Sequence, residues 1–409
     1  MSKNESIITA LDVGTSKVTT LVASRNAAGR IQFIGKGVAR NPDGMINGNV
    51  VNMEATTRAI NESVTEADKI CDVRIRSVLL GLSGEHISSL NSHGVFTVRG
   101  REVAQSDIDR VVEQSKNISL SGERRIVGTE MGEFVVDEQS GIKNPRGMAG
   151  RRLEVKTHVV TASVAMIQNL VRSVTDAGLQ VDEILVNGIA SAESVLQEDE
   201  KQLGVALVDI GDGTADIVVY KQGALVYTAV VPMGGRYITR DISIALRMPP
   251  AEAERVKCRF GCAEPKSVSP DEEIEVSCIG DEEKKIIKAQ FVAEVITPRV
   301  EEIMVNIRKK INEDIKDSFI SSGIVLTGGT ANLRYIKNIA EDVLGLPVRI
   351  GRPAISDDGM GFAELLRDPS FASAVGMAYY HGRRGGVKNG SSHGGLFGWL
   401  GRVMEKFFQ

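Results

Sequence analysis

Carboxylates, glycines and hydroxyls gather at one turn in the middle of the chain. Within Leu207 to Tyr220, two runs of β-forming residues are joined by the sequence Gly-Asp-Gly-Thr. The groups at or beside this turn that could do chemistry are Asp209, Gly211, Gly213, Thr214 and Asp216. Glycines let backbone N–H groups approach phosphate oxygens, a threonine hydroxyl adds a donor, and aspartates suit Mg²⁺ through its waters. The turn therefore predicts a site for a phosphate with its metal; the alternative is a plain Asp-Gly hairpin with solvated carboxylates.

A second copy of this pattern lies near the N-terminus, between Ile7 and Val22. It repeats the strand, the Asp-aliphatic-Gly step, a hydroxyl-rich turn and a second strand, with a turn one residue shorter. Its candidate site residues are Asp12, Gly14, Thr15, Ser16 and Lys17. Further strand patterns follow at 30–38 and 224–232, so the chain contains an internal duplication. We expect two β-meander domains that face each other across a phosphate. The predicted magnesium ligands, through water, are Asp12, Asp209 and Asp216, and the candidate catalytic residues are Asp12 and Asp216.

Three further segments extend the predicted nucleotide site. The stretch 323–331 is typical of a buried strand followed by a glycine pair that can lie flat against a nucleotide. Its candidate residues are Gly328, Gly329 and Thr330. Gly234 and Gly235 could bring more backbone amides to the site. On a helix predicted at 251–262, Glu254 and Lys257 fall one turn apart, which fits either a surface ion pair or a ligand contact.

The two turns and the Thr327-Gly328-Gly329 segment resemble, in the same order, the two phosphate motifs and the adenosine motif of the actin-like ATPase superfamily. Superfamily members use a Glu-x-x-Lys pair against ribose and adenine, a role that the resemblance implies for Glu254 and Lys257. ATP and Mg²⁺ are the implied cofactors.

Composition narrows the class of protein. The chain has 409 residues, 42% apolar and 25% charged, which is enough for large cores in two or more domains. Its net charge of −4 argues against a nucleic-acid binder. Cys71 and Cys278 lack metal-site spacing, and Cys258 and Cys262 are expected to be buried on one helix rather than to form a zinc or redox pair. Without a signal peptide or an apolar run near ~18 residues, we expect a soluble body with at most peripheral membrane contact.

Several elements around the motifs have clear patterns. Periodicity predicts a helix over Met53–Cys71. The apolar stripe of this helix is Ala55, Ala59, Ile60, Val64 and Ala67. A buried strand is expected over Ser77–Leu82. A helix is expected at 164–177 with Gly178 after its end, and a strand at 181–186. Small residues at 187–194 and 373–378 predict two helices that can pack closely at an interdomain hinge. A charged hairpin is expected at 271–288, followed by a basic helix over 291–311 that is either a solvated face or a dock for an acidic peptide.

Residues 83–156 have their own strand-helix-strand pattern and are numerous enough to form a separate small domain. A helix is predicted from Asp107 to Asn117, capped at Ser106 or Asp107, with strands at 94–98, 125–130 and 133–136. The segment 141–153 is glycine-rich and basic, which fits a solvated interdomain loop or a phosphate loop. The core is expected to resume with a strand at 157–162.

The end of the chain combines a linker with an amphipathic segment. Residues 381–395 are rich in Gly, Ser, Asn and Lys, which is typical of a flexible linker. Beyond it, one half of the helical wheel carries Leu396, Phe397, Trp399, Leu400, Val403, Met404, Phe407 and Phe408. The polar half includes Arg402 and Lys406, which suit an anionic lipid surface. We expect an in-plane membrane helix; a docking helix is the alternative.

Over essentially its whole length the chain resembles the FtsA family of bacterial actin homologues. The match rests on the phosphate turns, the Thr327-Gly328-Gly329 turn, the insertion after Leu82-Ser83-Gly84 with its 141–145 loop, and the terminal linker and helix. It implies an α/β actin-like ATPase fold with a small inserted α+β domain. The implied domains are a first core half (1–82 and 157–202), the inserted domain (83–156), a second core half (203–240 and 320–380), a peripheral subdomain (241–319), a flexible linker (381–395) and a membrane helix (396–408).

The resemblance also implies a function. The protein would bind ATP, polymerise on the inner face of the cytoplasmic membrane at the division site, and anchor the FtsZ ring. Its partners would be the C-terminal tail of FtsZ, for which Arg299 is the candidate contact, further copies of itself, anionic lipid, and late division proteins bound through the inserted domain. The alternatives are a PilM-type pilus assembly protein, which generally lacks the terminal membrane helix, and a kinase on the same core.

Two positions depart from the superfamily pattern. Gly188 stands where hydrolases often carry a Glu or Gln that orients the attacking water, so slow or negligible ATP turnover is expected. Asp212 replaces a third glycine of the phosphate turn. Its carboxylate would repel a polyphosphate unless Mg²⁺ or a base screens it, which predicts weakened ATP affinity.

Overall fold

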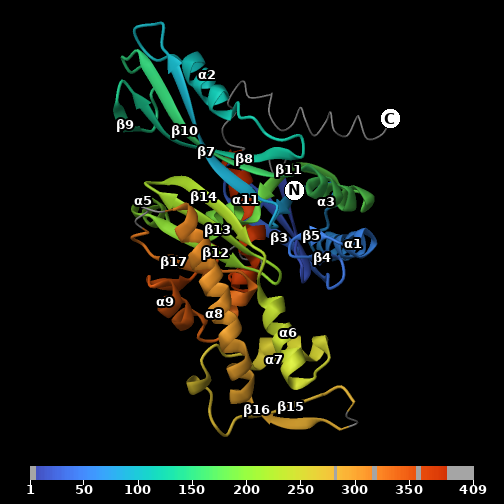
Figure 1. Ribbon diagram of the computed structural model, residues 1–409. Helices are drawn as coiled ribbons and strands as arrows, with labels where there is room; N and C mark the ends of the chain where they lie inside the picture. Colours follow the sequence, from blue (N-terminus) through green and yellow to red (C-terminus); the bar gives the residue numbers. More distant parts are fainter. Residues whose placement is uncertain (1–5, 281–282, 316–319, 356–360, 385–409) are drawn as a thin grey trace.

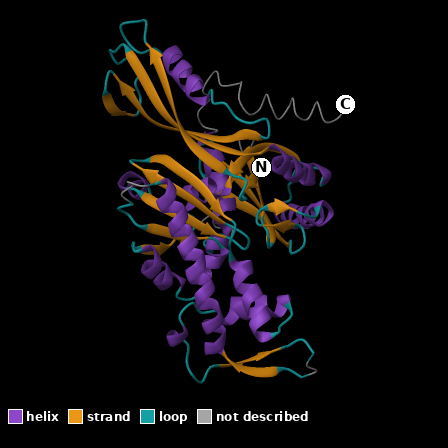
Figure 2. Cartoon of the chain, viewed as in Figure 1, coloured by secondary structure: helices purple, strands orange, loops and turns teal. Residues whose placement is uncertain are grey.

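Two five-stranded sheets of matching topology form the centre of the computed structural model, which describes residues 6–280, 283–315, 320–355 and 361–384 (Figures 1 and 2). The first has the order β11-β6-β1-β2-β3. Its strands are β1 (Ser6–Val13), β2 (Lys17–Arg25), β3 (Ile31–Arg40), β6 (Ser77–Leu82) and β11 (Gln180–Val186). β1 pairs antiparallel with β2 and parallel with β6, and the short hairpin β4 (Met45–Ile46) and β5 (Asn49–Val50) lies beside them.

The second sheet repeats this plan in the order β14-β13-β12-β17-β18. Its strands are β12 (Val205–Ile210), β13 (Ala215–Lys221), β14 (Ala224–Val231), β17 (Ile324–Thr327) and β18 (Val348–Ile350). β12 is antiparallel to β13 and parallel to β17, as β1 is to β2 and β6. Every residue of β12 is buried, as expected of a strand covered on both faces. The duplicated α/β core that the sequence predicted is confirmed.

Helices cover the sheets and join the two halves. They are α1 (Met53–Cys71), α3 (Val164–Asp176), α4 (Asn187–Val195), α5 (Glu198–Leu203), α9 (Ile336–Leu344), α10 (Ala363–Leu366) and α11 (Ala372–Arg384), with short 3₁₀ turns η2 (Gly329–Asn332) and η3 (Pro369–Phe371). The predicted apolar stripe of α1 is buried, and its bounds are those expected. The two small-residue helices, α4 and α11, pack tightly, because a Cβ at Gly376 would lie 1.7 Å from the carbonyl oxygen of Ala190.

The inserted domain is a four-stranded sheet, β7-β10-β8-β9, with one helix (Figure 1). Its elements are β7 (Ser88–Thr97), α2 (Gln105–Lys116), β8 (Arg124–Val136), β9 (Gln139–Ile142) and β10 (Arg152–Ser163). The expected strands at 125–130 and 133–136 are one strand, because the break at Met131-Gly132 marks an irregularity opposite Val155–Thr157, not a strand end.

Two more predictions for the inserted domain need correction. The cap of α2 is Ala104, whose backbone N–H donates to the Asp107 carboxylate at 3.0 Å, so Asp107 lies inside the first turn. The strand expected to resume the core at 157–162 belongs to β10, which pairs with β7 and β8 up to its end. The chain therefore stays in the inserted sheet until Ser163.

The peripheral subdomain lies at the opposite end of the molecule from the inserted domain (Figure 1). It contains α6 (Gly235–Leu246), α7 (Pro250–Phe260), η1 (Pro265–Ser267), β15 (Glu273–Val276), β16 (Lys285–Lys288) and the long α8 (Ala289–Asp314). Because α7 ends at Phe260, Cys258 and Cys262 do not share a helix as expected: Cys262 is buried beyond its end and Cys258 is exposed.

At the C-terminal side, α11 extends through residues expected to be linker. His381 lies 3.3 Å from a Glu183 carboxylate oxygen, and Gly382 packs against Ile31, so the helix continues to Arg384. The rest of the predicted linker and the predicted membrane helix lie outside the described residues. Of the helices that the structure describes, none combines the length and apolar character needed to cross a membrane.

Candidate nucleotide site

A cleft of about 550 Å³ lies between the two core halves, where the two homologous hairpin turns face each other. One turn, Gly14–Ser16, joins β1 to β2; the other, Gly211–Thr214, joins β12 to β13 and is one residue longer, as predicted. The N–H of Gly14 donates to the carbonyl of Lys17 at 3.0 Å, and that of Gly211 to the carbonyl of Thr214 at 2.8 Å. These bonds close each turn and place its tip residues at the cleft.

The predicted nucleotide-site residues line this cleft, except Gly234 and Gly235. The N–H of Gly235 donates to the carbonyl of Gly211 at 3.0 Å, and that of Arg236 to the carbonyl of Asp212 at 2.8 Å. The amides at the start of α6 therefore support the second phosphate turn from behind. The N–H groups of Gly235 and Arg236 are thus already bonded within the protein, and a nucleotide contact of Gly234 and Gly235 stays a prediction.

Three carboxylates line the cleft together: Asp209 and Asp216 are buried, and Asp12 is half-buried. Asp12 accepts hydrogen bonds from Asn187 at 3.0 Å and from Ser373 at 2.7 Å, and Asp209 accepts one from Ser191. Asp216 accepts from Ser83. The sequence analysis did not identify any of these four donors. Three of them lie at the small-residue helices α4 and α11, where a hydroxyl or amide among alanines and glycines was the available signal.

The same carboxylates repel each other in a poorly solvated place. Burial, with a contribution from the Asp12 charge, raises the pKa of Asp209 to about 7. The pKa of Asp216 is raised well above its ordinary value by burial and by the charge of Asp209. Such a set of hard oxygen donors suits a divalent cation. Within the described part of the chain, no three His, Cys, Asp or Glu side chains are grouped closely enough to hold a metal ion directly, and the water-mediated contact stays a prediction.

Lys17 adds a cation to the first turn. Its ammonium donates to the Ser370 hydroxyl at 2.9 Å and lies 4.3 Å from the centre of the Phe371 ring. Burial lowers its pKa, against the attraction of Asp12 and Asp368. The side chain is thus held at the cleft wall between the carboxylates and the turn before α11.

The other side of the cleft matches the predicted adenosine segment. Gly328 has φ +86°, and a Cβ there would lie 2.3 Å from an Asp209 carboxylate oxygen, so only glycine fits between β17 and the acid. Thr330 donates from its hydroxyl to the carbonyl of Gly211 at 2.8 Å. Glu254 and Lys257 form an ion pair of 2.7 Å, and the Lys257 side chain is only 13% exposed. Both residues line the cleft, and the Glu254 side chain is 41% exposed.

Comparison with known proteins identifies the family. A family model described as cell division protein FtsA matches residues 206–376, and another, described as the SHS2 domain inserted in FtsA, matches residues 84–161. The cell division protein FtsA of Pseudomonas aeruginosa is 40% identical over 374 residues, covering 91% of this chain and 89% of that protein. The chain belongs to the FtsA family. It is accordingly an actin-like cell division protein, as the sequence resemblance implied.

Solved structures with the same fold are more distant. The PilM–PilN type IV pilus biogenesis complex matches with a TM-score of 0.62 and 17% identity, covering 92% of this chain and 98% of that chain. The structure of MreB5 of Spiroplasma citri bound to ADP matches with a TM-score of 0.53 and 14% identity, covering 95% and 100%. These likenesses show the actin-like fold alone, so the PilM likeness does not displace the FtsA assignment.

Asp212 and Gly188, the two positions that depart from the superfamily pattern, have identifiable neighbours in the structure. Asp212 pairs with Arg236 at 3.2 Å, which supplies the screening base that the carboxylate requires. Burial raises the pKa of Asp212 while Lys257 and Arg236 lower it. Gly188 lies beside Asp216, since a Cβ there would be 3.3 Å from the Cβ of Asp216. It is buried, packs against Val218 as well, and offers no side chain that could orient water.

Arg299, the candidate contact for the FtsZ tail, is already engaged within the protein. Its guanidinium pairs with Asp241 at 2.5 Å and also with Glu302, and it lies 5.8 Å from the centre of the Tyr237 ring. An acidic peptide that docks on α8 would have to share or replace these carboxylates.

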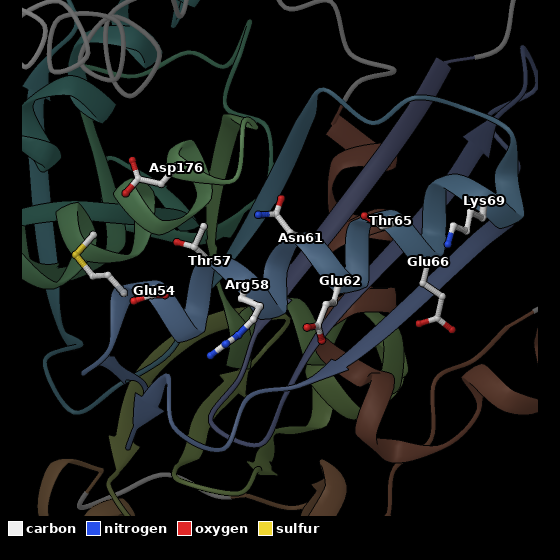
Figure 3. Close-up of a pocket in the computed structure, with 10 residues that line it drawn as sticks. Glu54, Thr57, Arg58, Asn61, Glu62, Thr65, Glu66, Lys69 and Asp176 are labelled. Atoms are coloured by element: carbon white, nitrogen blue, oxygen red, sulfur yellow. The ribbon is translucent and has the colours of Figure 1, made fainter.

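A second hollow, of about 860 Å³, runs along the outer face of α1 (Figure 3). Its lining is mostly exposed side chains of one helix, joined by Asp176 at the end of α3, and it contains no predicted site residue. The mixture of acids and bases there, including Glu62, Arg58 and Lys69, is typical of a solvated helix face. We therefore place the candidate site in the smaller interdomain cleft.

Proposed function

We propose that this FtsA-family chain binds ATP with Mg²⁺ in the cleft between its core halves. The observation that carries the proposal is the pair of homologous turns at one cleft that Asp12, Asp209 and Asp216 line, with Asp209 and Asp216 buried. The cation supplies a counter-charge for these acids and for the phosphates when it is bound. Further support comes from MreB5, which has the same fold and was solved with ADP.

The residues of the cleft divide into three proposed roles. Tip hydroxyls and amides of the turns, with Lys17, contact phosphate oxygens. The three aspartates hold metal-bound water, and the adenosine side comprises Glu254, Lys257 and the segment 328–330. Because Gly188 offers no group that orients the attacking water, we propose that ATP turnover is slow.

A titration with a fluorescent ATP analogue tests this proposal. Asp12→Asn should bind at least about tenfold more weakly in Mg²⁺, a loss of about 1.4 kcal/mol, and the difference should shrink in EDTA. Asp176→Asn, at the hollow along α1, is the matched control and should bind like the unaltered chain. Failure of the unaltered chain to bind the analogue would refute the proposal.

We also propose the cellular role that family membership suggests. The chain polymerises on the inner face of the cytoplasmic membrane at the division site, anchors FtsZ by binding its tail at α8, and recruits late division proteins through the inserted domain. Support comes from the FtsA assignment and from the amphipathic pattern of residues 396–408.

Sedimentation with anionic vesicles tests the membrane role. The full chain should pellet with vesicles, more so with Mg-ATP, whereas a version ending at Gly394 should stay in the supernatant. If both versions stay in the supernatant with and without nucleotide, residues 396–408 are a docking element and the tether proposal fails.

A further inference from the structure

The inserted domain is covalently part of the first core half but is fastened to the second. The chain leaves β6 at Leu82, passes through residues 83–87 and enters β7 at Ser88. Within that short connection, the Ser83 hydroxyl lies 2.9 Å and 2.7 Å from the two carboxylate oxygens of Asp216. It also lies 3.1 Å from the hydroxyl of Thr214. Ser83 therefore links the first half to the phosphate turn of the second half across the cleft.

The far end of the connection is tied to the inserted sheet. Arg124, at the start of β8, donates from its guanidinium to the carbonyl of His86 at 3.0 Å and to the carbonyl of Thr161 at 3.0 Å. The N–H of Ile87 donates to the carbonyl of Gly84 at 3.0 Å, which closes a turn between the two ends. A displacement at Ser83 thus reaches three strands of the inserted domain within a few bonds.

The connection also has little room to absorb movement locally. Gly84 has φ +139°, and a Cβ at Gly48 would lie 2.8 Å from both the Gly84 Cα and the Ser83 carbonyl oxygen. Ser83 is itself half-buried and lines the cleft. Close packing of this kind transmits a shift instead of dissipating it.

We propose that Ser83 positions the Asp216 carboxylate and transmits occupancy of the cleft to the inserted domain. This inference rests on the proposed nucleotide binding. Asp216 cannot offer the same lone pairs both to the Ser83 hydroxyl and to a metal-bound water. Loading of the cleft therefore changes the Ser83 contact, and residues 83–87 carry that change to β7 and β8. Nucleotide occupancy of the cleft therefore affects a partner bound to the inserted domain through residues 83–87.

A second set of contacts keeps the inserted domain seated when the Ser83 bond is lost. Ser89 on β7 donates to the carbonyl of Thr228 on β14 at 2.8 Å, and His158 on β10 lies 3.0 Å from the Thr228 hydroxyl. Removal of the Ser83 hydroxyl is therefore expected to uncouple the inserted domain from the cleft without detaching it from the core.

Hydrogen–deuterium exchange of the full chain, with and without saturating Mg-ATP, tests the inference. In the unaltered chain, Mg-ATP should change exchange both in the turns at 12–17 and 209–216 and in β7 and the start of β8. Ser83→Ala, and Ser83→Cys as a variant of similar volume, should bind Mg-ATP more weakly, because Asp216 loses its positioning contact. When each variant is saturated, the turns should still respond and the inserted domain should not. Ser83→Thr, which retains the hydroxyl, should restore it.

The matched control is Ser115→Ala, which removes a buried hydroxyl bonded to Thr157 within the inserted domain at 2.7 Å but leaves the connection intact. It should respond like the unaltered chain. Retention of the inserted-domain response in both Ser83→Ala and Ser83→Cys, or its loss in Ser115→Ala, would overturn the inference while nucleotide binding stands. Absence of any response in the turns of the unaltered chain would refute nucleotide binding itself, and the inference with it.

Discussion

At the scale of single residues, the acids of the cleft cost stability when no ligand compensates them. The pKa of Asp209 is raised to about 7 from an ordinary value near 4, so the unfolded chain loses this proton at a lower pH than the native protein. Stability is then lost as the pH rises between about 4 and 7. We predict that Asp209→Asn melts at a higher temperature than the unaltered nucleotide-free chain. The advantage should be larger at pH 8 than at pH 5, by on the order of 2 kcal/mol.

Thermal unfolding at the two pH values measures this effect, and Mg-ATP supplies the control. Because the substitution removes a proposed ligand group, added Mg-ATP should raise the melting temperature of the unaltered chain more than that of the variant. An Asp209→Asn protein that is less stable at both pH values, without nucleotide, would contradict the argument that carboxylate repulsion strains the empty cleft.

Asp212 is the residue whose interpretation changes most between sequence and structure. The sequence suggested weakened ATP affinity, but the Arg236 partner at 3.2 Å screens the extra charge. Arg236 also donates to the carbonyl of Pro42 at 3.3 Å and so crosses between the halves. We predict that Arg236→Ala weakens ATP binding about tenfold, that Asp212→Gly alone changes it less than about threefold, and that the double variant recovers most of the loss. Titrations of the three variants measure this, and a large gain for Asp212→Gly alone would restore the original hypothesis.

At the scale of elements, the two halves are joined where α11 crosses α4. A Cβ at position 376 would lie 1.7 Å from the Ala190 carbonyl oxygen, so the helices must separate to accept alanine. We predict that Gly376→Ala lowers the free energy of unfolding by about 3 kcal/mol, despite the better helix propensity of alanine. Gly122→Ala is the control, because nothing lies within 4 Å of a Cβ there. Chemical denaturation of both variants measures the difference in unfolding free energy. Equal stability of Gly376→Ala and Gly122→Ala would show that α4 and α11 can separate without loss of stability.

Polar contacts of Ser89 and His158 with Thr228 hold the inserted domain against β14, and the contact of His158 is sensitive to acid. Burial lowers the pKa of His158 to about 4, and its ring nitrogens lie 2.8 Å from the Asn91 amide oxygen and 3.0 Å from the Thr228 hydroxyl. A neutral native histidine contributes stability that is present above pH 6.5 and is lost as the pH falls toward 4. His158→Gln should therefore lose about 2 kcal/mol less than the unaltered chain between pH 7 and pH 5.

Unfolding free energies at the two pH values measure the difference. His86, whose pKa is also lowered to about 4 by burial and by Arg124, should still give the variant some acid sensitivity. Identical pH profiles for the two proteins would mean that His158 accepts a proton without disturbing the contacts between the inserted domain and β14.

The elements also show what sequence patterns could and could not supply. Met53–Cys71 and Ser77–Leu82 were predicted with their true bounds, because the first has a dominant helical period and the second is a short apolar run. The strand predicted at 157–162 missed the start of β10 at Arg152, because its pairing with β7 and β8 is recorded in no local pattern. In the site, duplicated turns revealed the acids. Their donors Ser83, Asn187 and Ser373 come from distant segments that only the folded core brings together.

At the scale of the whole molecule, the inserted domain and the β15–β16 hairpin lie at opposite ends of the core (Figure 1). A contact between the opposite ends of two copies would be heterologous and would extend into an open filament, whereas a self-complementary patch would stop at a dimer. This geometry agrees with the proposed polymer. It also bears on membrane attachment, because one short amphipathic helix gives only weak, reversible binding.

Attachment should therefore depend on assembly more than on the single anchor. Many helices on one filament bind with an effective concentration that a monomer lacks. We predict that, with Mg-ATP, the vesicle-bound fraction of the full chain rises steeply above a threshold protein concentration, whereas without nucleotide it rises gradually. Asp209→Asn should move the threshold severalfold higher at the same ATP concentration. Sedimentation over a protein dilution series, with Asp176→Asn as the control, measures the threshold. The same gradual rise with and without Mg-ATP would mean that each chain binds the membrane alone, and it would separate the membrane role from the cleft.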